Sequence, residues 1–544
     1  MSSDAGLSRW GWGHADREPT ESERLDLKRQ VETRLGFPER PLLSMPDDDP
    51  EVPESRVDPP FHFCTTDPDA RARHTYGKGY PDLVRGFHGE YGPAPDAVAR
   101  PEAASEIPDL LLWASEEQVA VVPFGGGTSV VGGVECTAPR YAGVVSLDTR
   151  ELDAVLEIDH TSRAARVQAG ATGPELNAQL AEEGLQLRHY PQSYEFSTFG
   201  GWVATRAGGH FATRYTHIDD FVESVRAETP VGPLETRRLP ASGAGPDPNR
   251  FLLGSEGAFG VITEGWVRVQ PRPRHRSRAT VRFDDFWDGV AATREVVQAR
   301  LSPANCRLLD PSEAMLNELA DDGSSLLLLG FESLDGPTAG DLERALASCA
   351  DHGGEWDDPI HRGPSHEGDA GGTGATADGD GDDDERSGTE GEWRSSFVEA
   401  PYRFNTLVSI GVLVDTFETA VTWDRFPDLH EAVRENVGAA MREQCGAGFL
   451  SCRFTHVYPD GPAPYYTLLA PAEPGTELEQ WRPIKQAASD TLDAFGATST
   501  HHHAVGRVHR DHYHREIPDS YLDALRSMKR TLDPEGIMNP GALL

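Results

Sequence analysis

Residues 119–133 read VAVVPFGGGTSVVGG, a short apolar run that passes directly into a glycine-rich turn. The β-branched residues at its start predict a buried strand over 119–124. Three glycines followed by a threonine and a serine then allow the backbone to approach a bulky anion such as a pyrophosphate, with successive N–H groups directed at it. The turn matches neither G-x-G-x-x-G nor G-x-x-x-x-G-K-[ST], so a glycine-rich turn without a ligand stays open as the alternative.

Helical and strand-like segments alternate around this turn, from about residue 92 to 273. Residues 102–117 predict a helix before the strand, and residues 173–185 predict another after it. This alternation is typical of an α/β or α+β domain.

The pattern changes after Pro273. Strands are predicted at 279–285, 324–333 and 407–414, with a helix at 340–349 close to the second of them. We therefore expect an α+β chain whose second, cap or substrate domain is built on an antiparallel sheet.

The ends of the chain and one internal tract complete the predicted organisation. Residues 21–36 and 518–533 read as helices. Residues 352–392 are rich in Gly and Asp with almost nothing apolar to bury, which predicts a disordered surface loop. The predicted units are a helical and extended segment at 1–91, the first domain at 92–273, the cap domain at 274–499, and a C-terminal segment at 500–544 that completes the active site.

The charge balance bounds the environment and the partners. The 544 residues carry a net charge of −39 from 89 acidic and 50 basic residues, and lysine occurs only at Lys28, Lys78, Lys485 and Lys529. Nucleic-acid binding is excluded because it needs clustered cations. Molar salt would screen the self-repulsion, so we expect a high-salt cytoplasm, with an acidic protein of ordinary salt as the alternative.

Cysteine usage and hydropathy indicate the compartment. The six cysteines form no C-x-x-C pair, which predicts buried thiols in a reducing compartment. The sequence shows no signal peptide and no run of about 18 apolar residues, so a cytoplasmic location without a transmembrane segment is expected. Peripheral contact with a membrane stays open.

Two further glycine-rich stretches follow the first. Residues 191–209 read PQSYEFSTFGGWVATRAGG, a permissive composition that suggests backbone packed closely on a ligand. Residues 251–269 read FLLGSEGAFGVITEGWVRV, in which Glu256 could accept a hydrogen bond from a ribose hydroxyl. A glycine-rich hairpin with an exposed glutamate is the alternative for this third stretch.

A run of three histidines, His501, His502 and His503, is the main candidate for chemistry. Imidazole titrates near neutrality, so one of them could move a proton at an active site. A solvated histidine-rich loop and a metal site are the alternatives. We expect no metal, because adjacent histidines should point apart and neither H-E-x-x-H nor a carboxylate pair accompanies them.

The three glycine-rich stretches, in this order, resemble the FAD-binding domain of the vanillyl-alcohol-oxidase (PCMH) type. The stretches SRWGWG (8–13), EWRSSF (392–397), FETAVTWDR (417–425), DGPAPYYT (460–467) and THHHAVGR (500–507) resemble the alkylglycerone-phosphate (alkyldihydroxyacetonephosphate) synthase branch. This resemblance implies a non-covalent FAD in a two-part domain. By position, the implied cofactor-binding residues are Pro123, Phe124, Gly125, Gly126, Gly127, Thr128 and Ser129; Pro191, Gln192, Ser193, Tyr194, Glu195, Phe196 and Ser197; Thr205, Arg206, Ala207 and Gly208; and Gly254, Ser255, Glu256, Gly257, Ala258, Phe259 and Gly260.

The resemblance also implies catalytic roles. His502 would abstract the proton, with His501 and His503 beside it, and Tyr466 would assist at the reacting carbon, although the match also admits Tyr465. Arg403 would hold the anionic end of the substrate, or else be an exposed arginine in an ion pair.

Two enzymatic functions and one binding function fit these residues. The synthase branch uses FAD without net oxidation and exchanges the acyl group of acyl-dihydroxyacetone phosphate for a fatty alcohol, which forms an ether lipid precursor. The alternative is an FAD-dependent dehydrogenase of a 2-hydroxy acid such as glycolate or D-lactate. A non-catalytic flavin-binding protein is the third reading. The partners would be a small-molecule or lipid-phosphate substrate and, by the habit of the family, a second copy in a homodimer.

Overall fold

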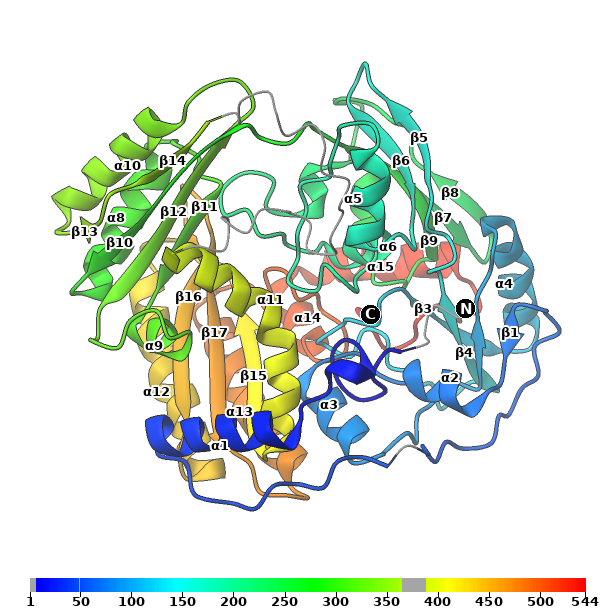
Figure 1. Ribbon diagram of the computed structural model, residues 1–544. Coiled ribbons are helices and arrows are strands. Elements are labelled where there is room, and N and C mark those ends of the chain that lie inside the picture. Colours follow the sequence, from blue (N-terminus) through cyan, green and yellow to red (C-terminus); the bar gives the residue numbers. More distant parts are fainter. Residues whose placement is uncertain (1–5, 48, 364–387) are drawn as a thin grey trace.

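The strand predicted at 119–124 is β3 (Val119–Phe124), buried at every position but one. It pairs in parallel with β4 (Gly143–Asp148) in a four-stranded sheet of order β1-β2-β4-β3, in which β1 is Cys64–Thr65 and β2 is Ala97–Ala99. The computed structural model describes residues 6–47, 49–363 and 388–544 (Figure 1). The helices that accompany this sheet are α2 (Pro68–Arg73), α3 (Tyr80–Phe87), and α4 (Ile107–Glu116) after the short η2 (Ala104–Glu106).

The second sheet is antiparallel and completes the first half of the molecule. Its order is β5-β6-β9-β7-β8. The strands are β5 (Val155–Asp159), β6 (Ala164–Gln168), β7 (Val222–Thr229), β8 (Gly232–Glu235) and β9 (Val261–Arg268), and the helical segments between them are α5 (Gly173–Ala181), α6 (Phe199–Thr205), η3 (Ile218–Asp220) and α7 (Asn249–Leu252).

The third sheet has eight antiparallel strands and forms the second half, on the left of Figure 1. Its order is β13-β10-β12-β11-β16-β17-β15, with β14 paired to β10. The strands are β10 (His275–Phe283), β11 (Asn305–Leu309), β12 (Ser325–Ser333), β13 (Glu355–Trp356), β14 (Ile360–Arg362), β15 (Val412–Glu418), β16 (Phe449–Val457) and β17 (Pro462–Pro471).

Helices cover this sheet and bury a large apolar cluster against it. The helices in contact with it are α8 (Phe286–Gln298), α9 (Pro311–Leu316), α10 (Ala339–Asp351), α11 (Gly388–Ser409), α12 (Phe426–Cys445) and α13 (Glu477–Ala494). The N-terminal helix α1 (Glu21–Leu35) packs on α11. The helix predicted at 21–36 is confirmed: Gly36 ends α1 in the left-handed conformation, and Thr20 caps its start in a reciprocal capping box with Glu23.

The C-terminal segment returns to the first half of the molecule. It contains α14 (Arg510–Glu516) and α15 (Asp519–Leu532). The Val121 N–H donates to the Ile537 carbonyl at 2.9 Å, and the Asn539 N–H donates to the Val121 carbonyl at 2.9 Å. The end of the chain therefore adds a short parallel bridge to the free edge of β3.

The structure confirms the α+β class with an antiparallel second half and corrects several local predictions. The apolar run 407–414 is not one strand, because α11 ends at Ser409 and β15 begins only at Val412, after Gly411 turns the chain with φ +75°. Within the predicted loop 352–392, residues 355–356 and 360–362 are strands and residues from 388 are helical, while 364–387 lie outside the described residues.

Two smaller findings concern the thiols and the membrane. All six cysteines are free, but Cys64 and Cys445 are only half-buried, which corrects the expectation that every thiol is buried. Across residues 6–47, 49–363 and 388–544, no helix combines the length and the apolar character needed to cross a bilayer.

Candidate active site

A cavity lies where the first half of the molecule meets the eight-stranded sheet. Its atom-free space is about 1690 Å³, including the opening to solvent. The glycine turn after β3 and the N-terminal part of α6 form one side, and residues of β11, β15, β16, β17 and the histidine run form the other. Segments far apart in the sequence thus supply one site.

Most of the predicted cofactor residues line this cavity. From the first glycine-rich stretch all seven do: Pro123, Phe124, Gly125, Gly126, Gly127, Thr128 and Ser129. From the other stretches the lining residues are Pro191, Gln192, Ser193, Ser197, Thr205, Ala207, Gly208, Glu256, Gly257 and Gly260. The residues not brought to the cavity are Tyr194, Glu195, Phe196, Arg206, Gly254, Ser255, Ala258 and Phe259.

The glycines of the turn are needed for close packing between segments as well as for access to a ligand. A Cβ on Gly126 would lie 1.9 Å from the Phe196 carbonyl oxygen, and one on Gly125 would lie 2.2 Å from Thr198 Oγ1. Gly127 has φ +64°, a conformation that favours glycine. The glycine turn and the segment 196–198 therefore pack in direct contact, and both also border the cavity.

The lining fits the FAD that the resemblance implies. A turn of backbone amides and the Thr128 and Ser129 hydroxyls are the groups that bind a pyrophosphate. Small residues such as Gly200, Gly201 and Ala204 continue along α6 and leave room for a flat ring system. When bound there, FAD would supply its redox-active and electrophilic isoalloxazine ring.

Glu256 holds the histidine loop, a role that was not predicted. Its two carboxylate oxygens accept the backbone N–H groups of Val505 at 2.9 Å and Gly506 at 2.7 Å. Burial is the main cause that raises its pKa to about 7. The side chain holds the end of the histidine loop and also borders the cavity, so its hydrogen bond to a ribose hydroxyl stays a prediction.

The histidine run brings two of its three imidazoles to the cavity. His502 and His503 line it, and His501 lies behind them. Burial lowers the pKa of His502 to about 3 and also lowers the pKa values of His501 and His503. All three rings are therefore neutral at pH 7, which is the form in which an imidazole can act as a base.

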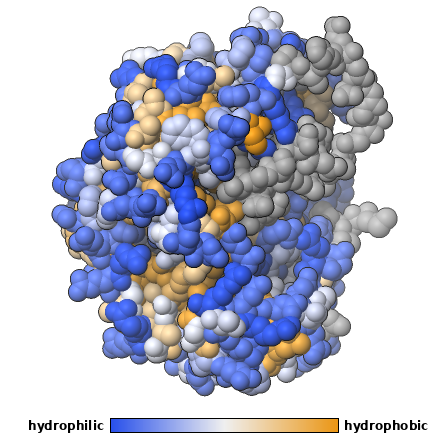
Figure 2. All heavy atoms as spheres, turned by 60° about the vertical axis from the view of Figure 1, so that its left-hand side comes forward, coloured by the Kyte–Doolittle hydropathy of each residue, from blue (hydrophilic) through white to orange (hydrophobic). Residues whose placement is uncertain are grey.

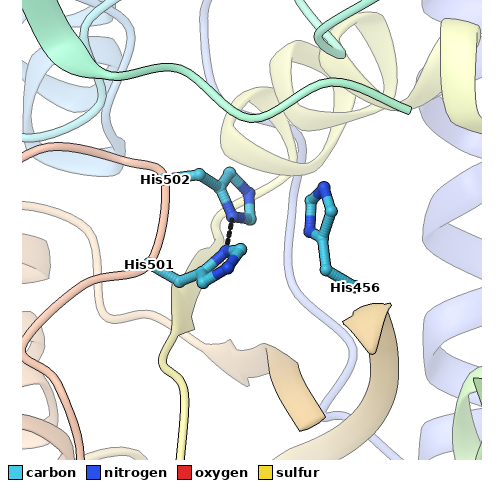
Figure 3. A group of neighbouring side chains, drawn as sticks. All are labelled: His456, His501 and His502. Carbon is cyan, nitrogen blue, oxygen red and sulfur yellow. Dashed lines mark hydrogen bonds between the residues drawn. The ribbon is translucent and has the colours of Figure 1, made fainter. Parts of the chain in front are cut away.

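Two imidazoles of the run, those of His501 and His502, converge, contrary to the prediction that adjacent histidines point apart (Figure 3). Nδ1 of His501 and Nδ1 of His502 form a hydrogen bond of 3.1 Å. His456 faces them from β16, and one nitrogen from each of these three rings lies within 4.8 Å of the others, so the group could hold a metal ion. The absence of a metal at this site stays a prediction.

The tyrosine at the cavity is Tyr465 and not Tyr466. Tyr465 stacks on His502 with ring centroids 6.0 Å apart and an interplanar angle of 16°. Tyr466 points to the opposite face of β17, where it is fully buried and its hydroxyl lies 3.3 Å from His430 Nδ1. Successive side chains of a strand alternate between its faces, so only one of the two can reach the site.

The cations at the cavity are Arg307 and Arg453, and Arg403 is not among its lining residues. Arg403 lies on α11 and donates to the Leu316 carbonyl at 3.3 Å. The Arg453 guanidinium carbon lies 3.9 Å from the centre of the Tyr465 ring. Arg307 donates to the His210 carbonyl at 2.8 Å.

Several lining residues were not predicted from the sequence. Arg307, Arg453 and His456 lie singly in strands β11 and β16, where no local motif marks them. Trp12 belongs to the SRWGWG stretch that carried part of the resemblance, and Asn405 fixes its backbone through hydrogen bonds of 2.8 and 2.9 Å. That stretch was therefore a usable signal for a residue of the site.

Comparison with known proteins identifies the family. Residues 95–236 match the family model described as FAD binding domain, and residues 272–543 match that of the FAD linked oxidases, C-terminal domain. Alkyldihydroxyacetonephosphate synthase of Dictyostelium discoideum is 30% identical over 487 residues, which cover 87% of this chain and 77% of that protein. The glycolate oxidase subunit GlcD of Bacillus subtilis is 25% identical over 467 residues, 84% of this chain and 90% of that protein.

The fold agrees with this assignment. A solved structure of alkyldihydroxyacetonephosphate synthase in P1 superimposes with a TM-score of 0.78 at 24% identity and covers 99% of this chain and 100% of that one. Two matching family models, a synthase relative at 30% identity and a cavity that fits the cofactor agree. The chain belongs to the FAD-linked oxidase family and is an FAD-dependent enzyme.

Proposed function

We propose that this enzyme is an alkyldihydroxyacetonephosphate synthase, which exchanges the acyl group of acyl-dihydroxyacetone phosphate for a fatty alcohol and releases the fatty acid. The synthases of Dictyostelium discoideum and Caenorhabditis elegans, each 30% identical to this chain, support the proposal. The relatives named for glycolate or D-lactate are 25% and 26% identical.

One observation carries the proposal: a neutral imidazole, a tyrosine and a cation face the same cavity beside the FAD-binding turn. His502 stacks on Tyr465, and the Arg453 guanidinium carbon lies 3.9 Å from the centre of the Tyr465 ring. In the proposed reaction His502 takes the proton from the carbon that carries the acyl ester. Tyr465, whose pKa burial raises, stays protonated and can donate to an oxygen of the substrate.

The phosphate end of the substrate is assigned to Arg307 and Arg453 in place of Arg403. Both guanidinium groups border the cavity, and two planar cations suit the oxygens of a phosphate. Arg453 is also paired with the buried Glu313, which fixes its position. The assignment predicts that charge removal at Arg453 weakens substrate binding and leaves FAD in place.

A 2-hydroxy-acid dehydrogenase is the second candidate. The GlcD relative and the D-lactate dehydrogenase of Arabidopsis thaliana support it, and the same cations would hold a carboxylate. His502 would then take the hydroxyl proton while a hydride leaves the neighbouring carbon. A non-catalytic flavin-binding protein would not need the imidazole, tyrosine and arginine at the cavity.

The deciding experiment follows the flavin absorbance of the purified protein anaerobically in molar salt. Glycolate, D-lactate and related 2-hydroxy acids are added first, and palmitoyl-dihydroxyacetone phosphate with labelled hexadecanol afterwards. An oxidised flavin with release of palmitate and incorporation of the labelled alcohol is expected. Full bleaching by a hydroxy acid without alcohol incorporation would establish the dehydrogenase instead.

The cellular setting belongs to the same proposal. The net charge of −39 and the presence of only four lysines lead us to propose that the enzyme works in a high-salt cytoplasm. We also propose a homodimer, a non-covalently bound FAD, and units at 1–91, 92–273, 274–499 and 500–544. Loose contact with a membrane surface would suit a lipid substrate.

A further inference from the structure

A buried carboxylate lies directly beneath the histidine run. Glu418 is the last residue of β15, and its side chain is 1% exposed. It accepts the backbone N–H groups of His502 at 3.2 Å and His503 at 2.8 Å, and also that of His501. The Thr500 hydroxyl donates to it at 2.6 Å. One carboxylate thus holds four consecutive residues.

Glu418 is also the nearest negative charge to these imidazoles. Its oxygens lie 3.8 Å from His502 Nδ1 and 3.5 Å from His503 Nδ1. Burial opposes ionisation, but the interactions with His502, His503, His501 and the Thr500 hydroxyl outweigh it and hold the Glu418 pKa well below its ordinary value. The residue is therefore a carboxylate at neutral pH.

A neutral buried base needs such a partner. Burial lowers the pKa of His502 to about 3, whereas the charge of Glu418 acts to raise it. Once His502 has taken a proton, an imidazolium exists in a nearly closed site, where an unpaired charge is costly. A fixed carboxylate within 4 Å offsets that cost only after proton transfer, so it favours the transition state over the ground state.

We infer that Glu418 is the positioning residue of this active site, which fixes the backbone of residues 500–503 and provides the countercharge for the proton on His502. Glu418 is not among the cavity-lining residues, so it acts through the histidines and not on the substrate. The countercharge part rests on the proposed role of His502 as a base. The backbone part rests on the contacts alone.

The other end of the loop shows that the two tasks are separable. Glu256 accepts two backbone N–H groups of residues 505 and 506, yet burial raises its pKa to about 7. Its hold on the loop does not depend on a full negative charge. Of these two carboxyl groups, Glu418 is the one that combines a hold on the backbone with an ionised group beside the imidazoles.

The first test needs no substrate: hydrogen–deuterium exchange of the FAD-loaded enzyme, wild type against Glu418→Gln. The amide nitrogen of glutamine cannot accept the His501 N–H, so exchange at residues 501–503 should be about tenfold faster, with 505 and 506 still protected. Asp415→Asn is the matched control, since Asp415 is a buried carboxylate of the same strand that contacts Trp481 and Lys485 and not the loop. Unchanged exchange at 501–503 in Glu418→Gln would overturn the positional role.

The second test measures the countercharge by kinetics. Glu418→Gln should lower kcat about 100-fold with KM within about threefold, because the loss falls on the transition state. The primary deuterium isotope effect at the carbon that loses its proton should increase. Thr500→Val, which keeps the charge and removes the hydroxyl's hydrogen bonds with Glu418 and with the His503 N–H, should lower kcat by less than about tenfold.

The outcomes separate the two claims. Faster exchange with unchanged kcat would overturn the countercharge and leave the proposed function intact. If the wild type turns over neither substrate class, the proposed function fails while the exchange result still decides the positional role. If Glu418→Gln does not retain FAD, Thr500→Val carries both measurements, and normal exchange at 501–503 together with normal kcat in that variant would overturn the inference.

Discussion

Nδ1 of His501 lies 3.1 Å from Nδ1 of His502, so one nitrogen of this pair must donate and the other must accept. The surroundings decide which. We assign the Tyr458 hydrogen to Thr216 Oγ1, 3.3 Å away, so that His501 Nε2, 2.8 Å from the Tyr458 oxygen, donates to that oxygen. His501 Nδ1 is then the acceptor, His502 Nδ1 carries the hydrogen, and His502 Nε2 keeps the lone pair.

This tautomer makes His502 the first residue to replace. His502→Gln removes the lone pair at the cavity and should lower kcat by about 10³-fold while FAD stays bound. The measurement is steady-state turnover with the flavin spectrum as the check on cofactor content. A variant with normal turnover would exclude His502 as the base.

The tautomer depends on Tyr458, which gives a second prediction. Tyr458→Phe removes the acceptor of the His501 Nε2 hydrogen. His501 can then adopt the tautomer with its hydrogen on Nδ1 and donate to His502 Nδ1. In that fraction of molecules His502 carries its own hydrogen on Nε2, so the lone pair of His502 Nε2 is lost. We expect kcat to fall about tenfold with little change in KM. Tyr513→Phe is a suitable control, because Tyr513 packs on the C-terminal cluster and its ring contact is with His514, outside the histidine run. Equal losses in both variants would point to a general effect on stability.

The two adjacent tyrosines of β17 predict opposite phenotypes. Tyr465→Phe should lower kcat by about tenfold to 100-fold without a large change in stability, because its hydroxyl faces the site. Tyr466→Phe should leave kcat within about threefold but lower the free energy of unfolding by about 1 kcal/mol, because His430 loses a buried partner. Turnover and urea unfolding of both variants check this, and the reverse pattern would restore the original assignment to Tyr466.

Burial of His509 predicts a pH dependence of stability. Burial lowers its pKa to about 3, so it is neutral in the folded state, whereas an unfolded histidine titrates near 6.5. Between these values the unfolded state binds the extra proton, so stability falls as the pH falls below about 6.5.

The His509→Gln variant isolates this contribution. At pH 5 the wild type should lose about 2 kcal/mol more than the variant relative to pH 7.5, from about 1.4 kcal/mol per pH unit. Urea unfolding in molar KCl at both values is the measurement. Parallel losses in the two proteins would contradict the buried neutral state of His509.

Local sequence signals predicted the parts of the fold that local chemistry determines. The β-branched run predicted β3 with its observed limits, and residues 21–36 predicted α1, which ends at Gly36. The run 407–414 was misassigned because an apolar helix end and an apolar strand look alike over so few residues, and only Gly411 marks the break.

The site was predictable where it is contiguous in sequence and not where it is assembled by the sheet. The glycine turn and the histidine run are local, so both were found. The choice between Tyr465 and Tyr466 depends on which face of β17 meets the cavity. Which of the two side chains points to that face is set by the register of strand pairing. Arg453 and Glu418 come to the histidines only through the order of strands in the eight-stranded sheet, which no local pattern encodes.

The bridge between Val121 and Met538 sets an order of events during synthesis. The strand that ends in the cofactor-binding turn emerges from the ribosome early, yet its edge partner emerges more than four hundred residues later, after both sheets of the first half. While the eight-stranded sheet is being synthesised, the nascent chain therefore lacks the segment that pairs with the edge of β3. We therefore expect FAD to load only after residues 537–539 have been synthesised, so that the supply of flavin would act on a nearly full-length apoprotein.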